Sequence, residues 1–426
     1  MRKAAIILLT SLFLVILVFS TNKNNIKNEN VLTFSTWGSE TELPIINSAI
    51  KQFEKENPSI KVKLIHIPKN YFQKVHLLIA SDLSPDVIFI NNIDGQKYIR
   101  AGVLLNLNNF INSDKTFSSN SFYEKALNAF KYKNAIFAIP RDISNLVIYY
   151  NKDLFDKYGV KYPSANWTLN DFLETSKKLT INKNKDKNPE QFGIGFETAP
   201  LFWLPFLWSN GGGIISSDGE NLILGSQNSI DSIQFYSNLR NSFHVAPTAS
   251  EAGSMTMGQM FINQKIAMQI NGRWAVPRYR KDLKFNWDIA QFPLGKKGSI
   301  VDADASGWSI SKQCKHPETA WKFIKFMSNK KSIDKITETG LIIPARKDSA
   351  NSDLFIDTKN KPHNAHVFLD IIKSSFPTPA SRNYNEISSI VSEALEPVWN
   401  GEKTAKETIN KHFLKKLENT FNEGKE

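Results

Sequence analysis

The hydrophobic pattern of the chain first becomes regular between residues 31 and 57. Residues 31–37 read as a β-strand that ends in Trp37. In the segment up to Asn57, apolar residues recur with the i, i+3, i+4 and i+7 spacing of one helix face: Ile46, Ala49, Ile50 and Phe53. Pro58 ends this helix, because proline cannot continue the backbone hydrogen bonding. The pattern therefore predicts a strand followed by an amphipathic helix.

The turn between this strand and this helix is the first candidate for function. Ser39 and Glu42 have the spacing of a capping box at a helix N-terminus. Trp37 and the unpaired N–H groups of the helix start would then lie at the carboxyl edge of a sheet, where ligands bind in open α/β folds. A core position at the strand end is the alternative interpretation of Trp37, and the pattern leaves both open.

The alternation of strands and helices continues along the chain. Residues 60–67 alternate as in a half-buried strand, and residues 71–81 predict a helix. Residues 85–90 form an apolar run, as expected for a strand that is buried on both faces of a parallel sheet, and Asn91 follows at its carboxyl end. Similar segments recur to the C-terminus. This order predicts an α/β fold with mostly parallel sheets flanked by helices.

Length and composition limit the possible classes of protein. A chain of 426 residues with 41% apolar residues is too long for one core and indicates two domains or lobes. The formal net charge is +12, from 53 basic and 41 acidic residues. Nucleic-acid binding would require a basic stripe with a recognisable motif, and we find neither, so no nucleic-acid partner is predicted. Attraction to an anionic solute stays open.

The N-terminal segment has the features of an export signal. Arg2 and Lys3 precede a nearly continuous apolar run over residues 4–19, and polar residues follow from Ser20. This order predicts a secretory signal at residues 1–20, removed after Ser20, with an uncleaved N-terminal anchor as the alternative. The single cysteine, Cys314, cannot form an internal disulfide, and no cysteine follows the apolar run to carry a lipid. A soluble periplasmic protein is the expected product.

A set of short motifs occurs in a characteristic order between residues 31 and 400. They are TFSTWG at 33–38, PDVI at 85–88, IPRD at 139–142, YYNKDLF at 149–155, WTLNDF at 167–172, NGG at 210–212, AMQING at 267–272 with Trp274, GWSI at 307–310 and AWKFIKF at 320–326. In this order they resemble the extracellular solute-binding proteins of carbohydrate-uptake ABC transporters, the family that includes maltose-binding protein.

The resemblance implies a two-lobe periplasmic-binding-protein fold with the solute in the cleft between the lobes and closure by hinge bending. It implies that the first lobe comprises residues 31–140 and 306–346, and the second lobe residues 141–305 and 347–426. It also implies a monomer that delivers a small carbohydrate to a membrane permease with cytoplasmic ATPases, and that needs no cofactor or metal.

Candidate ligand residues follow from the chemistry of sugars. A sugar ring presents C–H groups on its faces and hydroxyls at its edge, so a site needs flat aromatic rings and fixed polar side chains. The aromatic candidates at element ends are Trp37, Trp203, Trp274 and Trp308, whereas Trp208, Trp321 and Trp399 are expected in the core. The polar and backbone candidates are Glu40, Asp86, Asn91, Arg141, Asp142, Asn210, Gly272, Asp304, Gly307 and Arg346.

Two alternatives to a neutral-sugar receptor stay open. Arg141 and Arg346, together with the basic composition, are also compatible with a receptor for an anionic polyol such as a glycerol phosphate ester. A secreted carbohydrate-active enzyme would need only two carboxylates at a suitable separation. We find no metal-protease, phosphate-loop or nucleophile-elbow motif, so the sequence predicts a binding protein without catalysis of its own.

Overall fold

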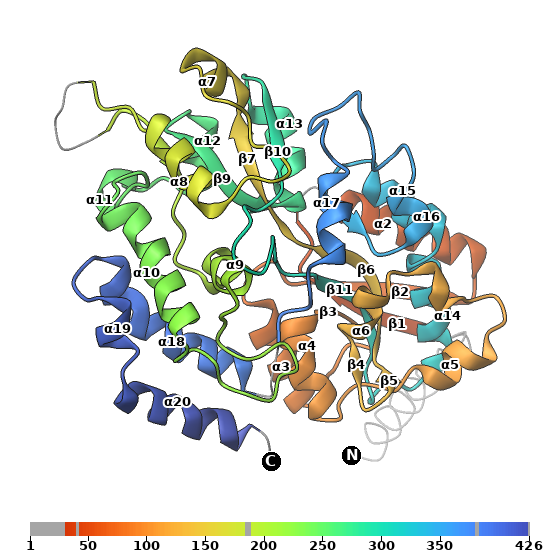
Figure 1. The fold of residues 1–426 in the computed structure, drawn as a ribbon. Coiled ribbons are helices and arrows are strands. Elements are labelled where there is room, and N and C mark those ends of the chain that lie inside the picture. The colour runs from red at the N-terminus through yellow and green to blue at the C-terminus, as the bar shows by residue number, and fades with distance from the viewer. Residues whose placement is uncertain (1–29, 40–41, 184–188, 380–382, 425–426) are drawn as a thin grey trace, which may run out of the picture.

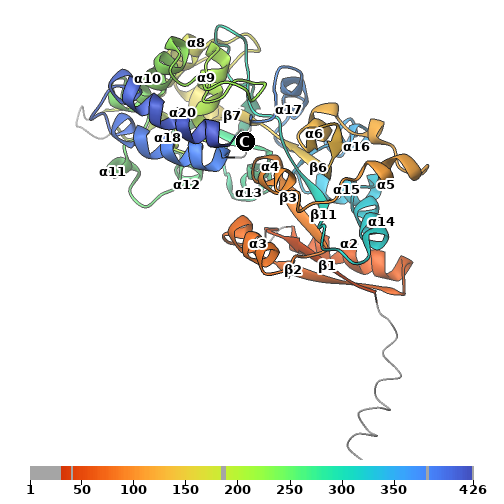
Figure 2. The ribbon, with the colours of Figure 1, turned by 90° about the horizontal axis from the view of Figure 1, so that it is seen from below.

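The computed structural model describes residues 30–39, 42–183, 189–379 and 383–424. These residues form two lobes, each a β-sheet flanked by helices, as Figures 1 and 2 show. The predicted two-lobe α/β fold is therefore confirmed. The predicted signal at residues 1–20 lies outside the described residues. Within the described part of the chain, no helix combines the length and the apolar character that a membrane span requires.

The first lobe is built on a six-stranded sheet. Its strands, in spatial order, are β12 (Ile343–Pro344), β6 (Ala138–Ser144), β11 (Asp304–Ile310), β3 (Val87–Asn91), β1 (Asn30–Thr36) and β2 (Ile60–His66). β1 pairs in parallel with β2 and β3, but β11 is antiparallel to both of its neighbours and β12 is antiparallel to β6. The prediction of a mostly parallel sheet is wrong for this lobe, because β11 enters it from the second lobe and runs against β3.

The helices of the first lobe bury the apolar faces that the sequence predicts. Ile46, Ala49, Ile50 and Phe53 are the buried residues of α2, and Phe53 packs against Phe323 of α14. The helices are α2 (Leu43–Glu56), α3 (Tyr71–Ala80), α4 (Asn92–Arg100), α5 (Asn108–Ser113), α6 (Glu124–Asn128), α14 (Pro317–Met327), α15 (Lys330–Thr337) and α16 (Lys347–Ala350). A short hairpin, β4 (Lys131–Tyr132) and β5 (Ala135–Ile136), follows α6.

The second lobe is built on a four-stranded sheet in the order β10 (Trp287–Ala290), β7 (Leu146–Asn151), β9 (Ile266–Gly272) and β8 (Phe192–Ile194). Only the β8–β9 pair is parallel in this sheet, so here too the pairing is mixed rather than mostly parallel. The helices that lie along the chain between β7 and β10 are α7 (Lys152–Lys157), α8 (Leu169–Lys178), α9 (Pro200–Asn210), α10 (Gln227–Asn241), α11 (Ala249–Ala252), α12 (Met257–Ile262) and α13 (Val276–Asp282).

The C-terminal helices complete the second lobe. α18 (Tyr384–Trp399), α19 (Ala405–Thr408) and α20 (Lys411–Glu423) lie together, and both α18 and α19 pack on α10. Their core is aromatic: Trp399 contacts Trp203 of α9 and Tyr236 of α10. α17 (Val367–Asp370) and the 3₁₀ turn η4 (Ile371–Lys373) precede them, and α17 packs on β7.

Three segments connect the two sheets. The first lies between β6 and β7 at Asn145, the second is residues 301–304, which lead into β11 and include its first residue, and the third is residues 376–378, which lie beside the second through the parallel bridge between Asp302 and Phe376. The lobe boundaries at residues 140, 306 and 346 stay a prediction; β6 is paired with β11 from Ala138 to Ser144, across the first of them.

Candidate ligand-binding site

A cavity of about 240 Å³ lies between the lobes, beside the connecting segments. Residues of the first lobe and of its crossing strands form most of its wall, and the second lobe contributes the turn after β9. The lining residues are Trp37, Glu42, Arg141, Asp142, Ile143, Ser144, Arg273, Trp274, Ser306, Leu341, Ile342 and Ile343. Of the candidates predicted from the sequence, Trp37, Arg141, Asp142 and Trp274 meet here.

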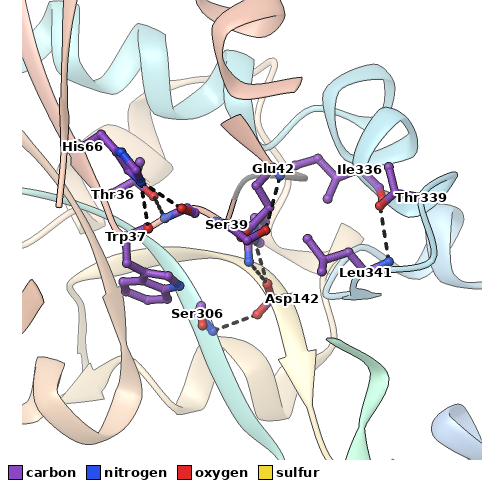
Figure 3. A network of polar contacts seen from close by, with 12 residues as sticks. Thr36, Trp37, Ser39, Glu42, His66, Asp142, Ser306, Ile336, Thr339 and Leu341 are labelled. Atoms are coloured by element: carbon purple, nitrogen blue, oxygen red, sulfur yellow. Dashed lines mark hydrogen bonds and ion pairs between the residues drawn. The ribbon is translucent and has the colours of Figure 1, made fainter. Parts of the chain in front are cut away.

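A buried ionic network forms the polar wall of the cavity. Arg141 Nη1 donates to Glu42 Oε1 at 2.7 Å, and its Nε and Nη2 both lie 2.6 Å from Asp142 Oδ2. The other oxygens are also held: Ser39 N–H donates to Glu42 Oε2 at 2.8 Å, and Ser306 N–H donates to Asp142 Oδ1 at 3.1 Å. Figure 3 shows Ser306 and Asp142 near the Trp37 ring, with Glu42 above them. The network presents fixed carboxylate acceptors to the cavity.

The pKa values of the two carboxylates in this network are shifted in opposite directions. Burial alone would raise the pKa of Glu42, but the charge of Arg141 and the hydrogen bonds from Ser39 and Arg141 lower it overall. Burial raises the pKa of Asp142 despite Arg141, and the negative charge of Glu42 adds to the rise. Burial would lower the pKa of Arg141, yet its two carboxylate partners raise it. Arg141 therefore keeps its charge and Glu42 is the more strongly acidic partner.

Aromatic contacts fix Trp37 at the carboxyl end of β1. Its ring centroid lies 4.4 Å from that of Phe89 and 5.2 Å from that of Tyr71. The guanidinium of Arg141 lies over the same Phe89 ring at 4.4 Å. His66 Nε2 lies 3.2 Å and 2.9 Å from the carbonyl oxygens of Trp37 and Gly38 and holds the turn. Trp37 is therefore a preorganised, partly exposed ring rather than a fully buried core residue.

Trp274 is the aromatic residue that the second lobe adds. Its side chain is 40% exposed, which is unusual for a residue of this size. The ring folds back over Gly272, where a Cβ atom would lie 2.0 Å from Trp274 Cζ3. Only glycine leaves room for the ring in this position. Gly272 thus acts by positioning Trp274, and its own carbonyl accepts a hydrogen bond from Tyr149 at 2.8 Å.

Arg273 is a second buried cation among the lining residues. Its Nε donates to the Gly340 carbonyl at 2.9 Å, and its guanidinium lies over the rings of Phe355 and Phe368 at 4.4 and 5.3 Å. Burial lowers its pKa to about 10. Its Nη1 and Nη2 find no hydrogen-bond partner in the described part of the chain. Arg273 ties the end of β9 to the loop before β12 and so joins the two lobes at the wall of the cavity.

Two predicted tryptophans lie in the core instead of the cavity. Trp203 is 0% exposed, its indole N–H donates to the Thr198 carbonyl, and its ring contacts Trp399. Trp308 is almost fully buried and packs against Phe89. Trp308 therefore supports the Phe89 ring, which Trp37 and Arg141 also contact. Trp203 belongs to α9 of the second lobe. Trp208, Trp321 and Trp399 are buried, as the sequence predicts.

Four predicted polar residues make contacts that stabilise the fold away from the cavity wall. Asp86 precedes β3 and accepts hydrogen bonds from the backbone and the side chain of Thr33. The remaining three act at turns and helix ends: Asn91 caps α4, Asn210 donates to Ser232 and accepts from Lys296 N–H, and Arg346 pairs with Asp348. None of the four lines the cavity.

The last three candidates have separate outcomes. Asp304 is buried at the second connecting segment, where it bonds Thr378 and Asn92. Gly307 follows the irregularity in the β11–β6 pairing, and a Cβ atom there would lie 2.4 Å from the Ile139 carbonyl oxygen, so glycine permits the close approach of the two strands. Glu40 lies outside the described residues.

Sequence reasoning missed more than half of the cavity wall. Glu42 is present in the pattern only as half of a capping box; the structure keeps its reciprocal bonds with Ser39 but begins α2 at Leu43, and it adds the ion pair to Arg141. Ser306, Arg273 and the run from Leu341 to Ile343 give no local signal of their own. Ser306 and Arg273 adjoin predicted residues, which is the one clue that the sequence offered.

A larger hollow of about 540 Å³ lies between α6, α16 and α17. Its wall includes Lys125, Lys347, His366 and Lys373, but no tryptophan and no buried ionic network of the described residues. Lys125 Nζ is engaged with the carbonyl oxygens of Ile372 and Lys373 at 2.6 and 2.8 Å. The smaller cavity is therefore the better candidate for a specific ligand.

Comparison with known proteins gives consistent matches. Residues 37–333 match the profile of the bacterial extracellular solute-binding protein family. The multiple sugar-binding protein of Streptococcus mutans is 26% identical over 341 residues, which cover 74% of this chain and 75% of that protein. An ABC substrate-binding protein from Listeria monocytogenes, solved in complex with cycloalternan, is 28% identical with a TM-score of 0.83, covering 93% of this chain and 99% of that one.

A further similar structure differs in its ligand. UgpB from Mycobacterium tuberculosis, solved in complex with glycerophosphocholine, is 18% identical with a TM-score of 0.80 and covers 92% of this chain and 99% of that one. At this identity the likeness concerns the fold alone.

Proposed function

This chain belongs to the bacterial extracellular solute-binding protein family, and from that premise we propose that it is the substrate-binding component of an ABC importer for a small carbohydrate. It binds a mono-, di- or oligosaccharide or a glycoside in the cavity between its lobes, closes by hinge bending and delivers the ligand to the membrane permease. It does this without catalysis. The mature protein acts as an exported, soluble monomer in the periplasm.

The observation that carries this proposal is the composition of the cavity. Trp37 from one lobe and Trp274 from the other supply apolar ring surface for the faces of a sugar. Glu42 and Asp142, held by Arg141, supply fixed acceptors for its hydroxyls. Because the network is already hydrogen-bonded, it requires little ordering when the ligand arrives. This combination suits a neutral polyhydroxylated ring. The names of the relatives, which refer to multiple sugars and to cycloalternan, agree with it.

An anionic polyol is the alternative ligand, and the two arginines that suggested it give it little support. Arg141 directs three of its nitrogens at two carboxylates, so its guanidinium is already engaged and is not free to bind a phosphate. Arg346 does not line the cavity and pairs with Asp348. The glycerophosphocholine complex of UgpB is a reason to include glycerol phosphate esters in any ligand screen.

A thermal-shift screen of the mature chain, from Thr21, tests the ligand class. The panel contains mono-, di- and trisaccharides, polyols, glycosylglycerols and glycerol phosphates, each at low and high salt. We expect a rise in Tm with one neutral saccharide that survives high salt, because ligand stabilises the folded state by mass action. A shift with phosphorylated solutes alone, lost in high salt, would replace the proposal by the anionic alternative.

Substitution of Trp274 tests the site itself. Trp274→Ala should weaken binding of the saccharide selected by the screen about tenfold, roughly 1.4 kcal/mol, with little change in Tm because the ring is 40% exposed. Tyr162→Ala is the matched control, since Tyr162 is also 40% exposed in the second lobe but does not line the cavity. Calorimetric titration measures both. Equal affinities for Trp274→Ala and the wild type would remove Trp274 from the site.

A further inference from the structure

The hinge between the lobes contains two buried carboxyl groups. Asp302 and Asp304 are alternate residues of the second connecting segment, so their side chains leave the extended backbone on the same side. The third segment lies beside them: Asp302 forms a parallel bridge with Phe376, and Ala303 N–H donates to the Phe376 carbonyl at 2.8 Å. Any movement of one lobe against the other must act on this pair of segments.

Asp304 has a full set of hydrogen-bond donors. Its Oδ1 accepts from Thr378 N–H at 2.7 Å and from Asn92 Nδ2 at 2.9 Å, and its Oδ2 accepts from the Thr378 hydroxyl at 2.8 Å. Asn92 in turn accepts from Ala305 N–H at 2.8 Å. Asp304 thus joins the second segment to the third and to α4 of the first lobe. Burial raises the pKa of Asp304 overall, although the hydrogen bonds from Thr378 and Asn92 act to lower it.

Asp302 has none of these partners. Its side chain is 0% exposed, and in the described part of the chain neither of its carboxyl oxygens has a hydrogen-bond partner. Its own N–H and that of Leu146 are near but fall outside hydrogen-bonding geometry. An isolated ionised carboxylate in such a place is very costly, and a protonated carboxyl costs far less. Burial, reinforced by the negative charge of Asp304, raises the pKa of Asp302 well above its ordinary value.

The charged and titratable groups around Asp302 do not offset this cost. Asp304 on the same segment is a like charge. Tyr384 of α18 faces both carboxyl groups, and burial, together with their charges, raises its own pKa as well, so it stays neutral. Lys125 of α6 approaches the third segment, but it donates to the carbonyl oxygens of Ile372, Lys373 and Ser375. No ion pair of the described residues includes Asp302.

We propose that Asp302 is a proton-dependent positioning residue of the hinge, which keeps the connecting segments packed while it carries a proton and loosens them when it loses it. A charged Asp302 requires water or a cation, and either can reach it only if the segments at Leu146 and Phe376 separate. The lobes then open, and the two walls of the cavity move apart. This inference rests on the proposed function only for its last consequence, a ligand affinity that falls as pH rises.

The direction of the pH dependence of stability follows from the linkage between proton binding and folding. The folded state binds the proton of Asp302 more tightly than the unfolded chain does, so its stability is greatest below the ordinary aspartate pKa and declines as pH rises through the folded-state pKa. One proton changes the folding equilibrium constant by at most about tenfold per pH unit. Asp302→Asn keeps the size of the side chain and cannot ionise, so it should hold the hinge in its packed state at every pH.

Urea unfolding of the unliganded mature chain across a pH series tests this directly. We expect the folding constant of the wild type, relative to that of Asp302→Asn, to fall by up to about tenfold per unit as pH rises above about 4. Asp353→Asn, at an exposed aspartate, is the matched control and should track the wild type. Identical pH profiles of wild type and Asp302→Asn would overturn the proposal. These readouts need no ligand, so they stand whether or not the carbohydrate assignment holds.

Two further measurements test the proposal independently of urea unfolding. Small-angle scattering of the wild type should show a radius of gyration that grows with pH, while that of Asp302→Asn stays constant; a constant value for both would contradict hinge loosening. If Asp302→Asn does not fold, Asp302→Ser serves in its place, and the infrared band of a protonated carboxyl at neutral pH should be present in the wild type and lost in the variant. Stability that depends on added Ca²⁺ and falls with a chelator would instead assign a cation to Asp302.

Discussion

Buried carboxyl groups occur in two neighbouring regions of this molecule, the cavity wall and the hinge, and their hydrogen-bond and ion-pair partners differ. At the cavity, Glu42 and Asp142 share Arg141 and backbone donors. At the hinge, Asp304 has neutral donors only and Asp302 has none. The side chains of all four residues are buried, so burial alone does not decide the charge state. The difference lies in the partners.

This difference separates two uses of a buried acid. A carboxylate that must accept hydrogen bonds from a ligand has to remain charged in a dry place, and for Glu42 the charge of Arg141 makes that possible by lowering its pKa. A carboxyl group that has no partner is held as the neutral acid, and its ionisation destabilises the packing of the segments around it. The comparison predicts opposite responses to substitution: removing a charge from the paired network destabilises the fold, whereas replacing the ionisable group of Asp302 by an amide stabilises the fold at neutral pH.

The largest expected effect is the loss of Arg141. Arg141→Met leaves Glu42 and Asp142 buried without a cation, so the free energy of unfolding should fall by about 3–5 kcal/mol, and saccharide binding should be lost. Urea unfolding at neutral pH measures the first effect. Arg141→Lys keeps the charge but not the forked donor geometry of the guanidinium. Its free energy of unfolding should lie between those of the wild type and Arg141→Met. A loss below about 1 kcal/mol for Arg141→Met would mean that the network is not needed for stability.

A smaller effect is expected at Glu42, and it depends on pH. Because the pKa of Glu42 is lowered in the folded state, its charge contributes stability that is present above the ordinary glutamate pKa and is lost as pH falls through the folded-state pKa. Glu42→Gln should therefore cost about 1–3 kcal/mol at neutral pH and progressively less in acid. Glu56→Gln, on the exposed end of α2, is the control. A cost that does not change with pH would assign the effect to packing.

The smallest effect is expected for a partly exposed ion pair, which serves as a reference for the two buried sites. Arg346 and Asp348 are 2.8 Å apart, and the hydrogen bond from Arg346 is the main cause that lowers the pKa of Asp348. Their side chains remain partly in solvent, so the interaction is screened, and Asp348→Asn should change stability by less than about 1 kcal/mol. Unfolding in low and in high salt checks this. A larger loss would show that position, and not burial, sets the value of an ion pair here.

The fold was predictable where local pattern and packing agree. The face of Ile46, Ala49, Ile50 and Phe53 is buried as its spacing predicts, and the alternation of strands and helices gives the α/β class. The direction of β11 was not predictable from its own residues, because it depends on the lobe from which the strand enters. The mixed pairing of both sheets is therefore a consequence of the crossing connections.

The site was predictable only in part, because distant contacts decide it. Trp203 and Trp274 look alike as tryptophans near element ends, yet Trp203 is covered by Trp399, almost 200 residues later, and Trp274 is left partly open. Glu42 has a sufficient local explanation as a helix cap, which conceals its bond to Arg141. Asp304 was expected at the ligand and lies at the hinge, since its partner Thr378 belongs to a segment that the pattern does not place near it.

The most direct test of the central claim is a crystal structure of the mature chain with the saccharide that the thermal-shift screen selects. We predict that the sugar lies in the cavity between the lobes, with Trp37 and Trp274 against its faces and its hydroxyls donating to Glu42 or Asp142. A saccharide bound elsewhere, or bound without contact to Trp274 and the Arg141 network, would contradict the account.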